Sequence, residues 1–592
     1  MTTKLMNESC DMPRKDYPRP QWVRENWYCL NGQWEFAFDF GKSGEARGMM
    51  NSGDYPMSIL VPFCPESKLS GIEYTDFMPA VWYRRTLTLS ELPEGRAILH
   101  FGAVDYFCKV WVNGILCGSH KGGFTSFEMD ITDALKCGEN TMVVYAEDDV
   151  RSGRQARGKQ CRSYYSCDCN YTRTTGIYQT VWLEFVPDRY LKHAKMTPHA
   201  KDGVLDISVN VENAKDGDIV LVTAKYQGST VGSTKAKVSF QYADARISVD
   251  DIRLWNPGNP ELYDLTVELM DGTTAKVIDR VESYFALRNI SLTKRALTVN
   301  GRPVFMRMVL DQGFNPDGIY TAPTDEYLKR DIELSMSLGF NGARFHERVF
   351  EDRSLYWADK LGYLVWGEHA MEDKSSAQGF SDFLPEWMET IRQYYNHPSV
   401  IGWMCSNETY HSWDKEFSGV AWVYNVTKTL DPYRPVIDAS GGVHGKTDMF
   451  DVHDYEQDPE KLAEYLKPML EDENAFHSPI ERYRGKGPLR DEYYEGQPYW
   501  ISECGGTLYN PNHEAVFGYG TAETEEQFAD GYEGLIKVMA SHPRVCGFCY
   551  TQLTDVEYEQ NGLFYYDRTP KFSQEIYDRI RKANEELAVI EK

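Results

Sequence analysis

The stretch Asn396-His397-Pro398-Ser399-Val400-Ile401-Gly402-Trp403-Met404-Cys405-Ser406-Asn407-Glu408 decides how the C-terminal half of this chain is interpreted. A His-Pro-Ser turn signal opens a short apolar run, and the run ends on an adjacent amide and carboxylate. A second stretch, Tyr499-Trp500-Ile501-Ser502-Glu503-Cys504-Gly505-Gly506, has the same order: an apolar run, one carboxylate, then glycines that turn the chain. Both patterns predict buried strands that deliver a carboxylate to the rim of a sheet.

Strands and helices alternate around these two stretches, from about residue 287 to residue 592. One expected helix, 324–338, has Thr324 as its N-cap and Gly339 as its stop, and another, 385–395, is expected to begin at Pro385. Eight strands with intervening helices predict a (β/α)8 TIM barrel over 287–592. The expected strands are 305–310, 340–345, 363–366, 400–405, 436–439, 449–453, 499–502 and 545–550.

The N-terminal half consists of short alternating strands separated by Gly, Pro, Asn and Asp. Residues 1–187 predict a jelly-roll β-sandwich, with strands such as 32–38, 81–87, 97–101 and 108–114. Residues 188–286 predict a smaller immunoglobulin-like β-sandwich, with strands at 205–211, 218–226, 235–240, 263–269 and 275–281. The chain is therefore expected to contain two β domains followed by a catalytic barrel.

Composition excludes several classes of partner. The 592-residue chain has a net charge of −26, which argues against nucleic-acid or anionic-membrane partners. It has no apolar run long enough to span a membrane, and its polar first 20 residues have no signal-peptide core, so a cytoplasmic location is expected. The 13 cysteines are scattered and are expected to be reduced, and the spacing of Cys161, Cys167 and Cys169 fits no zinc pattern. No metal and no cofactor is predicted.

Glu408 and Glu503 are the first candidates for catalysis. The active site of such a barrel lies at the C-terminal ends of its strands, where Glu408 follows the fourth and Glu503 the seventh. Two carboxylates without a metal site or a Ser-His motif favour glycoside hydrolysis, in which one is protonated and the other ionised. A nearby negative charge raises one pKa and so separates the two roles. The alternative is that both are structural carboxylates on the barrel rim.

The same stretches resemble a known family. Residues 396–408 match without a gap the acid/base signature of glycoside hydrolase family 2, although Gly402 and Met404 differ from its usual residues. Residues 341–366 resemble a second signature of this family but depart from it at 345–348. Segments 19–38, 61–66 and 176–182 look like its sugar-binding domain, so the resemblance covers nearly the whole chain. It implies a hydrolase with this domain order.

The resemblance also implies roles. Glu408 would be the acid/base, Glu503 the nucleophile of a retaining double displacement, and Asn407 the partner of the sugar 2-hydroxyl. Arg344 is expected to steady the nucleophile or neutralise a structural carboxylate, while Glu368 lies where some relatives bind magnesium, though nothing else completes such a site. Further candidates for substrate binding at strand ends are Asp311, His346, His453, Tyr455, Tyr550, Gln552 and Asn561. Asp311 is equally expected to cap a helix or a loop, and Tyr455 could hydrogen-bond Glu503. Tyr550 ends the eighth strand, where the family often places an aromatic platform under the sugar.

The sugar must be predicted from other residues than the reaction. β-Glucuronidases of this family carry an Asn-x-Lys motif past the eighth strand, where this chain has Glu559-Gln560-Asn561. We therefore expect an exo-acting β-glycosidase for a neutral terminal sugar, with a β-galactoside as the default by family frequency. An arabinosidase, galactofuranosidase, galacturonidase or mannosidase stays open, as does a non-catalytic carbohydrate-binding protein. Asp555, Glu557 and Glu559 could bind sugar hydroxyls, but a solvated acidic loop is the favoured interpretation. The chain is expected to form a dimer or tetramer.

Overall fold

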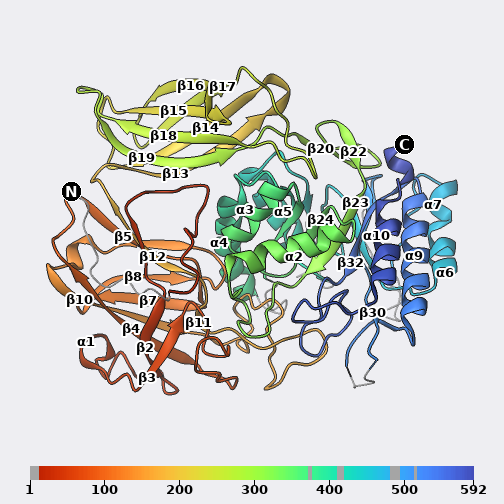
Figure 1. The fold of residues 1–592 in the computed structure, drawn as a ribbon, viewed down its shortest axis with the longest axis horizontal. Coiled ribbons are helices and arrows are strands. Elements are labelled where there is room, and N and C mark those ends of the chain that lie inside the picture. Colours follow the sequence, from red (N-terminus) through yellow and green to blue (C-terminus); the bar gives the residue numbers. More distant parts are fainter. Residues whose placement is uncertain (1–11, 371–376, 410–418, 480–493, 512–515) are drawn as a thin grey trace.

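The computed structural model describes residues 12–370, 377–409, 419–479, 494–511 and 516–592 (Figure 1). Two β domains, coloured red to orange and yellow to green, lie against a barrel coloured green to blue. Three parts of the predicted architecture are therefore present, although the predicted domain boundaries themselves stay a prediction. Within the described ranges, no helix is long and apolar enough to cross a membrane.

The first domain is a sandwich of two antiparallel sheets around one apolar core. The larger sheet has the order β3 (Met57–Val61), β2 (Gly32–Phe38), β4 (Ala80–Leu89), β10 (Gly138–Glu147), β7 (Phe107–Val112) and β8 (Ile115–Lys121). The smaller has the order β1 (Trp27–Cys29), β12 (Val181–Val186), β5 (Arg96–Phe101) and β9 (Phe127–Asp130). A short helix, α1 (Met49–Ser52), lies between β2 and β3, and β6 (Val104–Asp105) pairs with β11 (Gly176–Ile177). The long connection from β10 to β11 leaves this sandwich and reaches the barrel.

The second domain is also a two-sheet sandwich. One sheet has the order β13 (Tyr190–His199), β14 (Val204–Glu212) and β17 (Tyr242–Ser248). The other has the order β16 (Ser229–Lys237), β15 (Ile219–Tyr226), β18 (Tyr263–Met270) and β19 (Val277–Phe285). Strands β13 and β17 were absent from the sequence prediction. In β17 the buried side chains alternate regularly, but two of the three are alanines, Ala243 and Ala245, so the apolar signal is weak.

The barrel contains all eight predicted strands in one parallel sheet. Its order is β27 (Val436–Ile437), β26 (Val400–Met404), β25 (Leu364–Glu368), β24 (Gly342–Phe345), β23 (Met306–Asp311), β32 (Val545–Thr551), β29 (Tyr499–Gly505) and β28 (Phe450–Asp454). A small sheet, β20 (Ile290–Leu292), β21 (Leu297–Val299) and β22 (Arg302–Val304), precedes it, and β30 (Thr507–Leu508) pairs with β31 (Gly520–Thr521). Because the strands are parallel, their C-terminal ends gather at one mouth.

The helices of the barrel follow the alternation. They are α2 (Asp325–Ser337), α3 (Asp352–Leu361), α4 (Ala377–Tyr394), α5 (Gly419–Leu430), α6 (Pro459–Leu466), α7 (Pro468–Glu471), α9 (Glu525–Ser541) and α10 (Gln574–Glu585). The Thr324 hydroxyl caps α2 by accepting from the Tyr327 amide, as predicted. The predicted start of α4 is wrong, because Pro385 lies inside this helix. Pro385 and Ser381 are both exposed, so solvent can satisfy the Ser381 carbonyl that the proline leaves without a donor.

The stretch 396–408 joins the immunoglobulin-like domain to the barrel mouth. The Asn396 side chain exchanges two hydrogen bonds of 2.8 Å with the backbone of Ala194 and Met196, around β13 of that domain. Further along, Gly402 has no room for a side chain, because a Cβ atom there would lie 2.3 Å from the Trp366 ring. The rings of Trp366 and Trp500 stack 5.2 Å apart within the barrel. The immunoglobulin-like domain therefore holds the segment that leads into β26, and the tryptophans in the barrel interior pack against the middle of this strand.

Candidate active site

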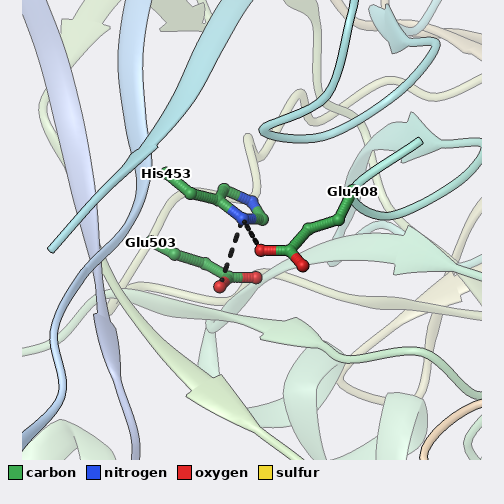
Figure 2. Close-up of side chains that lie close together, drawn as sticks. All are labelled: Glu408, His453 and Glu503. Carbon is green, nitrogen blue, oxygen red and sulfur yellow. Dashed lines mark hydrogen bonds and ion pairs between the residues drawn. The ribbon is translucent and has the colours of Figure 1, made fainter. Parts of the chain in front are cut away.

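Glu408 and Glu503 face each other across the barrel mouth, with His453 between them (Figure 2). Nδ1 of His453 lies 2.9 Å from Oε1 of Glu408 and 3.3 Å from Oε2 of Glu503. One oxygen of each carboxylate and the imidazole nitrogen all lie within 4.8 Å of one another. The parallel strands β26, β28 and β29 therefore bring together the two carboxylates that the sequence singled out.

Glu503 is buried but held in its charged form. Burial alone would raise the pKa of its carboxyl group, yet the charges of His453 and Arg344 lower this pKa below its ordinary value. Nη1 of Arg344 donates to Oε1 at 2.7 Å, and the Tyr455 hydroxyl donates to Oε2 at 2.5 Å. Both donors favour the ionised carboxylate, which is the form that a nucleophile requires.

Arg344 is the central cation of the site. It is fully buried at the end of β24, and its Nε donates to Oε1 of Glu368 at 2.6 Å. Its Nη2 donates to Oδ1 of Asn407 at 3.2 Å, and its Nη1 also donates to the Ser502 carbonyl at 2.9 Å. A planar guanidinium with five donors suits this task, because it orients several acceptors at fixed angles. Arg344 therefore sets the positions of the nucleophile candidate and of Asn407.

Glu368 and His346 support this arginine. Oε2 of Glu368 lies 3.2 Å from Nδ1 of His346 and accepts from the Glu347 amide at 3.2 Å. Burial, together with the charges of Lys159 and Arg344, lowers the pKa of His346 to about 3, so its imidazole is neutral near neutral pH. Because both oxygens of Glu368 already accept hydrogen bonds, its arrangement fits an anchor for Arg344.

Glu408 differs from Glu503 in its exposure. Its side chain is 34% exposed, and its backbone has a φ of 41°, in the left-handed region. A carboxyl group on the rim can exchange protons with solvent and reach a leaving group, which suits a general acid. Its neighbour Asn407 is buried and donates from Nδ2 to Oε1 of Glu347 at 3.0 Å.

One group of side chains could hold a metal ion among the His, Cys, Asp and Glu residues of the described segments: Glu408, His453 and Glu503. The two carboxylate oxygens of Glu503 accept hydrogen bonds from Arg344 and Tyr455, and Nδ1 of His453 faces both carboxylates. This arrangement fits hydrogen-bonded acid–base chemistry, in which the cationic partner is an arginine of the protein itself.

Four of the predicted site residues lie outside this cluster. Oδ1 of Asp311 accepts from the Gly313 amide at 2.8 Å, and burial together with Asp331 raises the pKa of Asp311 to about 7. The Tyr550 ring lies 5.0 Å from Tyr532 of α9, on the helix side of the sheet. The remaining two lie past the eighth strand: Gln552, which accepts from Gln312, and Asn561, which donates to Glu559.

The prediction of a solvated acidic loop past the eighth strand is wrong. Asp555 and Glu559 are both buried. Oδ1 of Asp555 accepts from Nζ of Lys571 at 2.8 Å, and Glu559 accepts from the Tyr171 hydroxyl. The segment folds inward because a lysine of the barrel and a tyrosine of the first domain supply the donors that its carboxylates need.

Sequence reasoning missed several polar groups at the mouth. Glu347 follows His346 in the segment that departs from the family signature, which was the one available signal. Lys159 and Tyr171 belong to the β10–β11 connection of the first domain, where nothing in the local sequence indicates a site. Tyr519 stacks on Tyr455 at 3.5 Å and 5°, and Tyr455 donates to Glu503, so these two rings lie beside the carboxylates where an aromatic platform was expected at Tyr550. The cysteines in the described ranges, including Cys161 and Cys167 with their sulfurs 3.8 Å apart, are free thiols.

Family models match most of the chain. The "Glycosyl hydrolase 2 galactose-binding domain-like" model matches residues 66–182, and the "Glycosyl hydrolases family 2" model matches 189–288. The "Glycosyl hydrolases family 2, TIM barrel domain" model matches 290–481. The three models are in the order of the three architectures described above.

Individual relatives carry two kinds of name. A putative beta-glucuronidase of Formosa agariphila is 26% identical over 62% of this chain and 46% of its own length. The beta-glucuronidase of Canis lupus familiaris is 25% identical over 71% of this chain and 69% of its own length. The beta-galactosidase of Lactococcus lactis is 26% identical over 67% of this chain and 38% of its own length. The chain thus spans less than half of the first and third of these relatives.

Solved structures share the fold over nearly the whole chain. A Ruminococcus gnavus beta-glucuronidase in complex with an N1-substituted uronic isofagomine has a TM-score of 0.76 and 21% identity, covering 96% of this chain and 100% of that one. An uncultured Clostridium sp. beta-glucuronidase has a TM-score of 0.76 and 21% identity, covering 95% and 99%. At this identity the likeness establishes the three-part architecture.

Proposed function

The chain belongs to glycoside hydrolase family 2, and from this premise we propose that it is a retaining, exo-acting β-glycosidase. One observation carries the proposal: an oxygen of Glu408 and an oxygen of Glu503 lie within 4.8 Å of each other. Carboxyl groups about 5–5.5 Å apart are typical of retaining enzymes, whereas inverting enzymes separate them by about 6.5–9.5 Å to admit a water. The closeness of these two oxygens favours the retaining arrangement, in which one carboxylate attacks directly.

In the proposed reaction Glu503 attacks the anomeric carbon and forms a covalent glycosyl-enzyme. Arg344 and Tyr455 keep its carboxylate ionised and aim it. Glu408 donates a proton to the leaving oxygen, and then, as a carboxylate, removes a proton from the water that releases the sugar. Nδ1 of His453 lies within 3.3 Å of both carboxylates and fixes their positions relative to each other.

Exo action is supported by the β10–β11 connection of the first domain, which forms a wall against one side of the mouth. The Tyr171 hydroxyl of the first domain donates to Glu559, and the Thr172 amide donates to Oε2 of Glu557 at 3.0 Å. Such a wall accommodates a chain end better than the middle of a polymer.

Covalent trapping tests the mechanism. We expect a 2-deoxy-2-fluoro β-galactoside with an activated leaving group to inactivate the enzyme and to add its glycosyl mass to the peptide that contains Glu503. The Glu503→Gln variant should lose more than about 1000-fold in turnover of aryl β-glycosides while keeping its native fold, as circular dichroism would show. A matched control is Glu585→Gln on α10, whose side chain lies near Gly339 at the opposite end of the barrel. Labelling elsewhere, or full activity of Glu503→Gln, would overturn the mechanism.

We propose a neutral terminal sugar as the substrate, with an aryl β-galactoside as the first to test. The support is the pair Glu559 and Asn561, which stands where β-glucuronidases of this family carry Asn-x-Lys. Arabinosidase, galactofuranosidase, galacturonidase and mannosidase activities belong to the same panel of aryl glycosides. Tight sugar binding without any hydrolysis across the panel would instead identify a carbohydrate-binding protein.

A β-glucuronide is the second candidate, because Lys159 brings a cation to the mouth and several relatives are named beta-glucuronidases. Paired aryl galactosides and glucuronides distinguish the two candidates directly. A dimeric or tetrameric assembly and a cytoplasmic location stay predictions, which sedimentation and cell fractionation would test.

A further inference from the structure

The connection between β10 and β11 of the first domain docks on the barrel mouth at two places. Gly158 touches the end of β24: a Cβ atom at this residue would lie 2.3 Å from the Glu347 carbonyl, and its φ is 56°. Tyr171 is fully buried and donates to Glu559, beyond the end of β32. The Tyr171 amide donates to the Lys159 carbonyl at 2.8 Å, so the two contacts belong to one backbone pairing. Lys159 is thereby held at a fixed place on the rim.

The groups around Lys159 have unused hydrogen-bonding capacity. Nζ of Lys159 lies 3.9 Å from Oε2 of Glu347 and makes no hydrogen bond within the described residues, although its side chain is only 15% exposed. Oε2 of Glu347 is buried and has no hydrogen-bond partner in the same part of the chain. Asn561 donates to Glu559, which lies close enough to Lys159 for each charge to shift the pKa of the other. Oδ1 of Asn561 is also buried and without a partner in the described residues. Buried polar atoms are rarely left unpaired, so this edge of the mouth is built for a ligand with hydrogen-bonding groups.

Glu347 is connected to the reacting centre. Its other oxygen, Oε1, accepts from Nδ2 of Asn407 at 3.0 Å, and Oδ1 of Asn407 accepts from Arg344. Arg344 in turn donates to Glu503. A sugar held by Lys159 and Glu347 would therefore be positioned relative to the nucleophile through two hydrogen-bonded side chains.

The charges of this edge do not favour an anionic ligand. Among the described residues, the Cys169 thiol and two buried carboxyl groups, Glu347 and Glu559, lie near the ammonium of Lys159. Burial raises the pKa of Glu559, while Lys159 lowers it, and the net shift is upward. A carboxylate on the substrate would share one cation with two carboxyl groups and meet repulsion. A hydroxyl group, by contrast, can accept from Lys159 and donate to Glu347 or Asn561 at the same time.

We infer that Lys159, Glu347 and Asn561 form a subsite for the hydroxyl groups of a neutral terminal sugar, to which the first domain contributes the cation. The inference rests on the proposed glycosidase function and specifies which residues determine its substrate class. It also assigns the Lys159 ammonium as a hydrogen-bond donor rather than as a receptor for a uronic acid carboxylate.

The test combines Lys159 variants with paired substrates. Wild type should hydrolyse an aryl β-galactoside faster than the corresponding β-galacturonide, and an aryl β-glucoside faster than the β-glucuronide. Lys159→Ala should lose about 10- to 100-fold in kcat/KM on the neutral sugars, because a hydrogen bond from a charged donor is removed. The matched control is Arg154→Ala, which removes an exposed cation from the same connection.

Deoxy sugars locate the contact. Removing the hydroxyl that Lys159 binds should weaken wild type by about the same factor as Lys159→Ala, and should not weaken the variant further. Unchanged kcat/KM in Lys159→Ala, or a wild type that prefers uronides and loses that preference in the variant, would overturn the inference. Failure of the proposed function is distinguishable, since then neither substrate would be turned over and no fluorosugar would label Glu503.

Discussion

Glu503 in the barrel and Glu66 in the first domain are 4% and 2% exposed, yet their carboxyl groups are in opposite charge states. The pKa of Glu503 is lowered by His453 and Arg344 despite burial. The pKa of Glu66 is raised to about 8 by burial, with Asp148 adding to the rise. The Thr175 side chain and the backbone amides of Thr175 and Glu66 lower this pKa, but these neutral donors do not offset the burial.

The comparison teaches that partners, rather than burial, decide what a buried carboxyl group can do. With an arginine and a tyrosine hydroxyl it is an ionised nucleophile candidate. With neutral donors and other carboxyl groups around it, it is a neutral acid at neutral pH. The predictions below exchange or remove these partners.

Removing Arg344 should have the largest effect. Arg344→Met leaves Glu503 and Glu368 buried without their cation, so we expect kcat/KM to fall by at least about 100- to 1000-fold. The pKa of Glu503 should rise, which moves the acidic limb of the pH–rate profile to higher pH. The free energy of unfolding should fall by about 3–5 kcal/mol, the usual cost of breaking a buried ion pair.

Arg344→Lys is the control for charge alone. It keeps the cation but not the fork that contacts Glu368, Glu503 and Asn407 together. We expect partial recovery of stability and little recovery of kcat. Full activity in either variant would refute the view that Arg344 holds the nucleophile in place.

Tyr455→Phe removes one donor and leaves the cation. The hydrogen bond of 2.5 Å to Oε2 of Glu503 favours the ionised form. Its loss should therefore raise the pKa of Glu503 and shift the acidic limb upward, with a fall of about 10- to 100-fold in kcat. A pH–rate profile of the variant measures both, and an unshifted acidic limb would argue against this role.

For Glu66 the test is to remove the ionisable carboxyl group itself, because its pKa is raised rather than lowered. Its pKa rises from 4.5 to about 8 on folding, so the folded protein keeps a proton that the unfolded chain has released. The stabilisation is complete below about pH 4.5 and is lost as the pH rises through about 8. Glu66→Gln keeps an acceptor for the Thr175 amide and should gain about 1–3 kcal/mol over wild type at pH 9, with little gain at pH 5.

Melting curves at the two pH values check this prediction. Glu35→Gln is the control, because Glu35 is half-exposed and pairs with Arg84, which lowers the pKa of its carboxyl group. That variant should show no gain at pH 9. Equal gains in both variants would show that overall charge, rather than the burial of Glu66, limits stability in alkali.

The strands and the closeness of the two candidate carboxylates were predictable because their signals are local. Each of Glu408 and Glu503 ends an apolar run that a turn or glycine delimits. Because the strands are parallel, their C-terminal ends meet at one mouth and bring the two side chains together. Lys159 was not predictable, since its role depends on the docking of one domain on another. Nothing in the residues that precede or follow it differs from an ordinary polar loop.

The sequence also could not predict whether a side chain at a strand end points into the barrel or toward the helices. Along β23 and β24, Leu310 is opposite Arg344 and Asp311 is opposite Phe345. Arg344 points into the mouth and Phe345 packs with the helices, so Asp311 points outward as well. Between β29 and β32 the register shifts twice, which breaks the simple alternation before Glu503 and Tyr550. One residue of register decides whether a polar group is in the site or behind it.

Asp311→Asn tests that conclusion and should have the smallest effect on activity. The carboxyl group caps the Gly313 amide on the helix side of β23, and an amide oxygen can do the same. We expect kcat/KM within about twofold of wild type. Since burial and Asp331 raise the pKa of Asp311 from 3.8 to about 7, its stabilisation is lost as the pH rises through 7, and the variant should melt higher than wild type at pH 9 but not at pH 5. A large loss of activity with an unchanged melting temperature would place Asp311 in the site and contradict the register that separates it from Arg344.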